Sequence, residues 1–324
     1  MTLYLFSYHK THMKEEQAKD DETVRSDDKL KVSCFGASVT RQKTGYATLL
    51  KSKLGPNYEV SIHGYGGAYL NDAGVIYIDE VLLEKPDICV VDWFSTQFEN
   101  KIPIADIEVF VGTIIRQFSL INCRLLFLFL PRTDTDVRHD FYDECYRVLR
   151  KYNMEYLDLI SEYDPDSLDI VRDYVHTTDL GSELYSDRIS EEVLQRKINI
   201  PNTLPPDNIY CHIKSIKFDD VEIYDKIELS GNCTIIGANL TIGPHSGIIS
   251  LSGVRQNTWD VWCYYERQSI KIANILINGQ AELKVLQDQF SRARCKEQID
   301  WGSYRLKLIL HEIFYSGDLT VGAV

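Results

Sequence analysis

The chain has 324 residues, of which 44% are hydrophobic and 26% charged, and its formal net charge is −13 at pH 7. This length suits two domains or one large domain, with enough apolar residues to fill real cores. Nucleic acids and anionic membranes bind basic surfaces, so the acidic charge argues against both as partners.

The cysteines and the N-terminus bear on the compartment of the protein. None of the eight cysteines belongs to a Cys-x-x-Cys pair or to a Cys/His cluster with metal-ligand spacing, which argues against a zinc site. Several lie in or beside apolar runs, Cys89 and Cys123 among them, as is typical of buried free thiols in a reducing compartment. The apolar residues 2–6 are too few for a signal-peptide core, and no run is long enough to span a membrane. We therefore expect a cytoplasmic protein with a flexible polar lead-in over residues 1–29.

Strand-like and helix-like segments alternate from residue 30 to residue 198. The strand-like runs are Lys31–Phe35, Tyr58–Ile62, Ile88–Trp93, Arg124–Leu130 and Glu155–Leu159. The helix-like stretches are Gly45–Leu54, Asp72–Leu83, Ile104–Phe118, Asp136–Tyr152 and Asp179–Arg196. This alternation predicts βαβ units, and therefore an α/β domain with a parallel sheet and helices on both faces.

The loops that follow the strands are the expected place for a site, because such sheets bind ligands at the carboxyl ends of their strands. Ser38 follows the first strand, Gly67 lies in the loop after the second, and Thr96 follows the third. Further polar residues near this edge are expected to be solvated-loop or salt-bridge residues: Arg41, Asn71, Asp92 and Arg132. Two histidines are expected to be surface or hydrogen-bonded core residues: His63 and His139.

A different pattern begins after residue 198. Residues 199–207 are rich in proline and polar residues and predict a linker. Residues 208–324 contain many short strand-like runs separated by turn residues, which predicts a smaller all-β sandwich, jelly-roll-like, as an accessory domain. Its aromatic residues suit either a core or a sugar-stacking platform, because strand alternation places them on both faces. They are Trp259, Trp262, Tyr264, Tyr265 and Trp301.

Three polar side chains of the first domain have the types needed for nucleophilic catalysis. Ser38 lies at a strand-to-helix turn in the sequence Gly-Ala-Ser-Val-Thr (36–40), and Asp173 and His176 are three residues apart, about one helical turn. Serine is a poor nucleophile without a base, and the base needs an orienting group. The expected roles are Ser38 as nucleophile, His176 as base and Asp173 as the acceptor that orients the imidazole.

These residues lie in segments that resemble the SGNH (GDSL-type) hydrolase family over residues 30–196. Residues 35–50 resemble its first block, residues 63–72 its second, and residues 173–181 its last, Asp-x-x-His followed by a helix. The resemblance implies a flavodoxin-like three-layer α/β/α fold and a Ser38–Asp173–His176 triad. It also implies an oxyanion hole built from the backbone N–H groups of Ser38 and Gly67.

The third block departs from the family pattern. The family places an asparagine here that completes the oxyanion hole, whereas this chain has Thr96 at that position. A hydroxyl donates one hydrogen bond, so Thr96 is the candidate third donor. Outright loss of such a donor costs on the order of 100-fold or more in rate.

The leading hypothesis is a serine esterase that removes an acyl group, acetyl first of all, from a carbohydrate or similar small ester. It needs no metal and no cofactor. One alternative is an O-acetyltransferase that uses the same triad to acetylate a glycan. Another is a glycan-binding protein with a degenerate hydrolase domain. The sequence leaves open whether the chain forms a homo-oligomer.

Overall fold

The computed structural model describes most of the first domain and the strands of the second. The described residues are 29–66, 68–71, 73–96, 102–134, 140–165, 169–195, 200–201, 203–223, 226–230, 233–243, 248–252, 258–265, 268–277, 282–287, 307–318 and 320–321. The expected lead-in therefore lies outside the described residues, apart from Lys29.

The first domain is built on a five-stranded sheet in which every strand pairs in parallel with its neighbours. The strands lie in the order β2-β1-β3-β4-β5, the flavodoxin-like order that the sequence analysis expected. Their bounds are β1 Leu30–Gly36, β2 Tyr58–Gly64, β3 Ile88–Asp92, β4 Arg124–Phe129 and β5 Glu155–Asp158.

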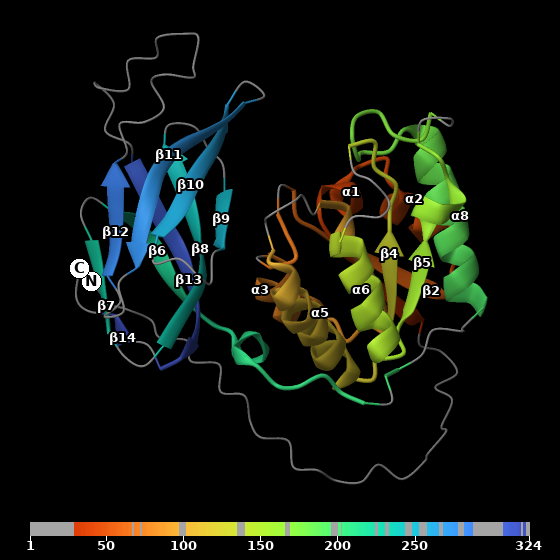
Figure 1. Ribbon diagram of the computed structural model, residues 1–324, viewed down its shortest axis with the longest axis horizontal. Coiled ribbons are helices and arrows are strands. Elements are labelled where there is room, and N and C mark those ends of the chain that lie inside the picture. The colour runs from red at the N-terminus through yellow and green to blue at the C-terminus, as the bar shows by residue number, and fades with distance from the viewer. Residues whose placement is uncertain are drawn as a thin grey trace.

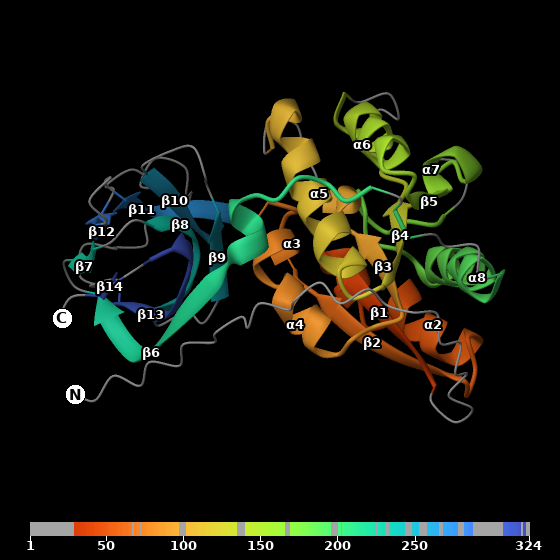
Figure 2. The same cartoon turned by 90° about the horizontal axis from the view of Figure 1, so that it is seen from below.

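Helices cover both faces of this sheet (Figures 1 and 2). The α-helices are α1 Ser38–Arg41, α2 Tyr46–Lys53, α3 Ala73–Ile76, α4 Ile78–Leu83, α5 Ile104–Ser119, α6 Asp140–Lys151, α7 Leu159–Glu162 and α8 Asp179–Gln195. Two 3-10 helices are η1 Phe94–Thr96 and η2 Ile209–His212. The single helix predicted over residues 72–83 is wrong, because the described chain forms α3 and α4 with a break at Tyr77.

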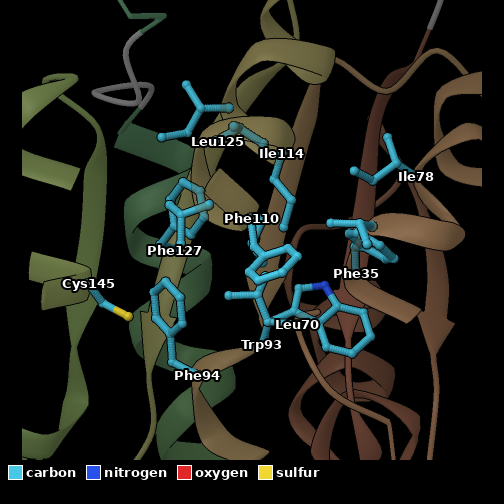
Figure 3. Packing of buried hydrophobic residues seen from close by; sticks show 14 of the residues in the cluster. Phe35, Leu70, Ile78, Trp93, Phe94, Phe110, Ile114, Leu125, Phe127 and Cys145 are labelled. Atoms are coloured by element: carbon cyan, nitrogen blue, oxygen red, sulfur yellow. The ribbon is translucent and has the colours of Figure 1, made fainter. Parts of the chain in front are cut away.

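The sheet is buried on both sides, which explains why its central strands are apolar without alternation. Phe35 and Trp93 belong to one core (Figure 3). Cys89 and Val91 of β3 are part of the same core. Val90, between them, points into the second core on the other face of the sheet. The two cores hold the strands rigidly, so the loops at their carboxyl ends have a fixed base.

The second domain consists of two antiparallel sheets, as predicted for a β-sandwich (Figure 1). One sheet has the order β6-β13-β8-β9 and the other β10-β11-β12-β7-β14. The strands are β6 Lys214–Ile223, β7 Lys226–Ser230, β8 Cys233–Gly243, β9 Ile248–Ser252, β10 Thr258–Tyr265, β11 Gln268–Ile277, β12 Glu282–Gln287, β13 Lys307–Gly317 and β14 Thr320–Val321. The candidate aromatic platform lies on β10, whose side chains are outside the described part of the structure, and at Trp301, which is outside it altogether.

The segment predicted as a linker is fastened to helix α5. Arg116 Nη1 donates to the carbonyl of Pro205 at 3.0 Å, and directly after the segment Thr113 exchanges hydrogen bonds with Asn208. Because these contacts are specific, the described part of this segment has a defined path along the helix.

The two domains also share apolar contacts. Phe314 of β13 is buried in the same core as the helices α3 to α6, and its ring meets the edge of Tyr77 at 5.8 Å. Tyr210 of η2 packs on Phe110 at 4.9 Å. The second domain therefore docks against the first through α5 and the α3–α4 break.

Candidate active site

Ser38 lies two residues after the end of β1 and is the first residue of α1. The N–H of Ala37, the residue before it, donates to the carbonyl of Asp92 at 3.0 Å, which ties the turn to the end of β3. Gly36 has no space for a side chain, since an added Cβ would lie 2.4 Å from both that carbonyl and the Thr40 hydroxyl. Close packing of this kind fixes the direction in which the Ser38 side chain leaves the turn.

His176 and Asp173 lie in a tight loop before α8, and the structure brings both to Ser38. The imidazole Nε2 is 2.9 Å from Ser38 Oγ, and Nδ1 is 2.9 Å from Asp173 Oδ2. The loop closes on itself, because Val171 and Thr177 form an antiparallel bridge. The three side chains thus form one hydrogen-bonded chain in the order that nucleophilic catalysis requires.

The surroundings of Asp173 stabilise its ionised form. Burial raises the pKa of this carboxyl, but hydrogen bonds from the backbone N–H of Val175 and of His176, together with the imidazole, outweigh it and lower the pKa below its ordinary value. An ionised Asp173 accepts the Nδ1 proton of His176, which leaves Nε2 free to accept the proton of Ser38.

Gln42 joins the loop of His176 to the turn of Ser38. Its Nε2 donates to the carbonyl of Thr177 at 2.8 Å, and its Oε1 accepts from the Thr177 N–H and hydroxyl, both at 3.2 Å. Gln42 was not among the residues predicted for the site. Its partner is 135 positions away, so no local pattern indicates the contact.

Asp92 is fully buried at the end of β3, and the expectation of a solvated or salt-bridged residue is wrong. Its Oδ2 accepts a 3.0 Å hydrogen bond from Thr40 Oγ1, and Thr40 is 2.8 Å from the Tyr46 hydroxyl. Burial raises the pKa of Asp92 to about 6, with the polar groups of Ser95 and Thr40 opposing part of that rise. The one signal in the sequence was a carboxylate at the end of an otherwise apolar run.

Arg132, after β4, is a buried salt-bridge residue. Its guanidinium pairs with Asp134 at 2.7 Å, donates to the carbonyl of Ser95, and lies 5.2 Å from the centre of the Tyr174 ring. Tyr174, between Asp173 and His176, is 46% exposed. Arg132 thereby connects η1 with the loop that carries His176.

The remaining predicted residues have mixed outcomes. Gly67 and His139 lie outside the described residues, and Thr96 is described only as part of η1, so the oxyanion roles stay predictions. His63 Nε2 lies 3.1 Å from Glu84 Oε2. Arg41 is exposed and Asn71 is half-buried.

The described residues also bear on metal sites, membrane-spanning helices and cysteines. Within them, no group of three or more His, Cys, Asp or Glu side chains could hold a metal ion, and no helix is long and apolar enough to cross a membrane. The described cysteines with assigned burial are free and buried: Cys34, Cys89, Cys123, Cys145 and Cys211.

Comparison with known proteins identifies the fold. No family model matches the chain, and no curated protein matches it. A solved two-domain esterase active on acetylated mannans covers 90% of this chain and 93% of its own, at 12% identity and a TM-score of 0.56. The chain has the SGNH hydrolase fold. The same esterase co-crystallized with mannopentaose covers 90% of this chain and 92% of its own, at 13% identity and a TM-score of 0.56.

A shorter solved structure is also similar to part of the chain. An acetyl xylan esterase covers 51% of this chain and 100% of its own, at 22% identity and a TM-score of 0.44. The two-domain match extends through both the SGNH domain and most of the β-sandwich, because it covers 90% of the chain.

Proposed function

We propose that the protein is a serine esterase that removes an acyl group from a carbohydrate, with acetyl as the expected acyl group. The observation that carries the proposal is the hydrogen-bonded chain from Ser38 Oγ through His176 to Asp173, with both separations at 2.9 Å. Few arrangements other than acyl transfer use a serine at a strand-to-helix turn against an imidazole oriented by a carboxylate.

The reaction follows from the roles of these groups. Ser38 Oγ attacks the ester carbonyl while His176 Nε2 takes its proton. The tetrahedral intermediate then collapses, and His176 gives that proton to the departing sugar hydroxyl. Water attacks the acyl-enzyme with His176 again as base, which releases the carboxylic acid and restores Ser38.

The oxyanion hole is part of the proposal. The N–H groups of Ser38 and Gly67 would hold the negative oxygen of the intermediate, with Thr96 as a third donor. A carbohydrate substrate is supported by the two-domain relative, which acts on acetylated mannans. The β-sandwich would then be an accessory domain of the esterase.

The first experiment labels the protein with a fluorophosphonate, maps the modified peptide, and measures hydrolysis of p-nitrophenyl acetate. Wild type should be labelled on Ser38, and Ser38→Ala and His176→Ala should lose both labelling and hydrolysis. Ser52→Ala, which changes an exposed serine on α2, is the matched control and should behave as wild type. Hydrolysis by Ser38→Ala at the wild-type rate would contradict the proposal.

A second experiment tests the carbohydrate. Wild type is incubated with acetylated manno-oligosaccharides and with acetylated xylo-oligosaccharides, and released acetate is measured against Ser38→Ala. Release from either class supports a carbohydrate esterase. If p-nitrophenyl acetate is cleaved but neither oligosaccharide is, the esterase stands and the carbohydrate part of the proposal fails.

A further inference from the structure

We propose that Asp92 is a positioning residue, a buried carboxyl group that holds the turn of Ser38 from beneath and keeps Ser38 within reach of His176. This inference rests on the proposed esterase function. It concerns a residue that belongs to neither the triad nor the expected oxyanion donors.

Asp92 contacts the turn on both sides of Ser38. Its backbone carbonyl accepts from the N–H of Ala37 at 3.0 Å, and its side-chain Oδ2 accepts from Thr40 Oγ1 at 3.0 Å. Ala37 precedes Ser38 by one residue and Thr40 follows it by two. A single residue of β3 therefore fixes both ends of the short segment that carries the nucleophile.

The directions of these hydrogen bonds follow from the chemistry of the three groups. Thr40 has one hydroxyl proton and donates it to Asp92, so the 2.8 Å contact with Tyr46 must have the tyrosine as donor. Tyr46 keeps its proton, because burial raises its pKa well above the ordinary value. The result is a polarised chain, Tyr46 to Thr40 to Asp92, whose members strengthen one another in a low-dielectric interior.

The surroundings make Asp92 the group whose charge changes near neutral pH. The titratable side chains that face it are buried thiols and phenols whose pKa values are all raised, and they are Cys34, Tyr46, Tyr142 and Tyr185. The guanidinium of Arg132, which follows β4, donates to the carbonyl of Ser95. Thr40 Oγ1 donates to the carboxyl group at 3.0 Å, and the polar groups of Ser95 also act on it, since they lower its pKa.

The consequence for the reaction is geometric. Ser38 Oγ and His176 Nε2 are 2.9 Å apart, and this separation depends on where the turn lies. A displacement of about 1 Å in such a site costs ~100-fold in rate. Loosening the Thr40–Asp92 contact should therefore lower kcat for p-nitrophenyl acetate while KM changes little.

The test compares two isosteric Thr→Val variants. Thr40→Val removes the hydroxyl that binds Asp92, whereas Thr113→Val removes an equally buried hydroxyl on α5, remote from the sheet edge. The expected result is a loss of about 10- to 100-fold in kcat and in the rate of fluorophosphonate labelling for Thr40→Val. Thr113→Val should keep both within about threefold of wild type, and equal rates in the two folded variants would overturn the proposal.

Two Asp92 variants supply the rescue. Asp92→Asn keeps the shape and one oxygen acceptor for Thr40, so it should retain activity above pH 7 and lack the part of the pH–rate profile that titrates near pH 6. Asp92→Leu keeps the volume without an acceptor and should match Thr40→Val. Activity of folded Asp92→Leu at the wild-type level would contradict the proposal.

Crystal structures of Thr40→Val and Thr113→Val separate this inference from the esterase function. A Ser38–His176 separation beyond hydrogen-bond distance in Thr40→Val alone supports the positioning role, whether or not wild type is labelled. An unchanged separation in both variants overturns it. Absence of labelling from wild type with intact geometry would contradict the esterase, and the structural comparison would still decide the role of Asp92.

Discussion

The side chain of Gln42 forms three hydrogen bonds with Thr177, one donated from Nε2 and two accepted by Oε1. Gln42 lies four residues after Ser38, and Thr177 directly follows His176. The nucleophile and its base are therefore joined twice, once by their own contact and once by this neighbouring pair.

Replacing Gln42 with Met should remove this tether while keeping the side-chain length. Each lost hydrogen bond costs about 1 kcal/mol, so the free energy of unfolding should fall by roughly 1–3 kcal/mol. The rate of fluorophosphonate labelling should also fall, because the His176 loop gains freedom. Urea denaturation and labelling measure the two effects. Lys43→Met, at the exposed neighbouring position, is the control and should change neither.

Gly181→Ala should destabilise the protein strongly, because the start of α8 touches the strand-like segment before the His176 loop. An added Cβ would lie 2.0 Å from the carbonyl oxygen of Ile170, which already accepts from the Thr178 N–H at 3.0 Å. Overpacking of this kind costs about 1–3 kcal/mol or more.

Gly55→Ala provides the contrast for Gly181→Ala. Gly55 has a positive φ of 78° and no atom within 4 Å of an added Cβ, so only backbone strain opposes the change. That strain costs roughly 1–2 kcal/mol. Urea denaturation of both variants should show the larger loss at Gly181. A loss at Gly181 that is no larger than the loss at Gly55 would contradict this overpacking at the start of α8.

The sequence predicted the parts of the fold that depend on local pattern. The five parallel strands and their helices follow from alternation of apolar segments, and Ser38 and Asp173 each lie within hydrogen-bond distance of His176. Their catalytic role and the oxyanion donors stay predictions.

The features that the sequence did not predict depend on contacts between distant residues. Gln42 meets Thr177 only because two loops converge at the sheet edge. Asp92 is buried at the end of β3, where Thr40 of α1 donates to its carboxyl group. The helix over residues 72–83 is broken at Tyr77, whose ring stacks on Tyr65 at 4.5 Å and contacts Phe314. Periodicity along the chain carries no information about such tertiary partners.

Asp92 should make stability depend on pH between about 4 and about 7. Burial raises its pKa from 3.8 to about 6 in the folded protein. Well below pH 3.8 the carboxyl group is protonated in both the folded and the unfolded state, so it adds no cost to folding. As pH rises, the unfolded chain ionises first, and above pH 6 the folded protein holds a buried charge. Stability is therefore lost across this interval, by roughly 3 kcal/mol.

Asp92→Asn tests this pH dependence. The difference in unfolding free energy between wild type and the variant, measured by urea denaturation from pH 4 to pH 8, should move in favour of the variant as pH rises. Other titrating groups are common to both proteins and cancel in the difference. A difference that stays constant with pH would show that Asp92 has an ordinary pKa.

Phe314→Ala should loosen the docking of the β-sandwich on the SGNH domain. Phe314 is 6% exposed, belongs to the core of the first domain, and meets Tyr77 edge-on at 5.8 Å. Removing a buried phenyl ring costs about 3–5 kcal/mol, because the cavity that remains is only partly filled. Scanning calorimetry should show a lower unfolding temperature.

Tyr315→Ala is the matched control for Phe314→Ala. Tyr315 is the next residue of β13 and is only half-buried. Its loss should therefore lower the unfolding temperature less. If the domains unfold independently in wild type, both variants should affect only the β-sandwich transition, and the shared core inferred from Phe314 would be contradicted. A lower temperature for both domains in Phe314→Ala would show that the two are energetically coupled through this ring.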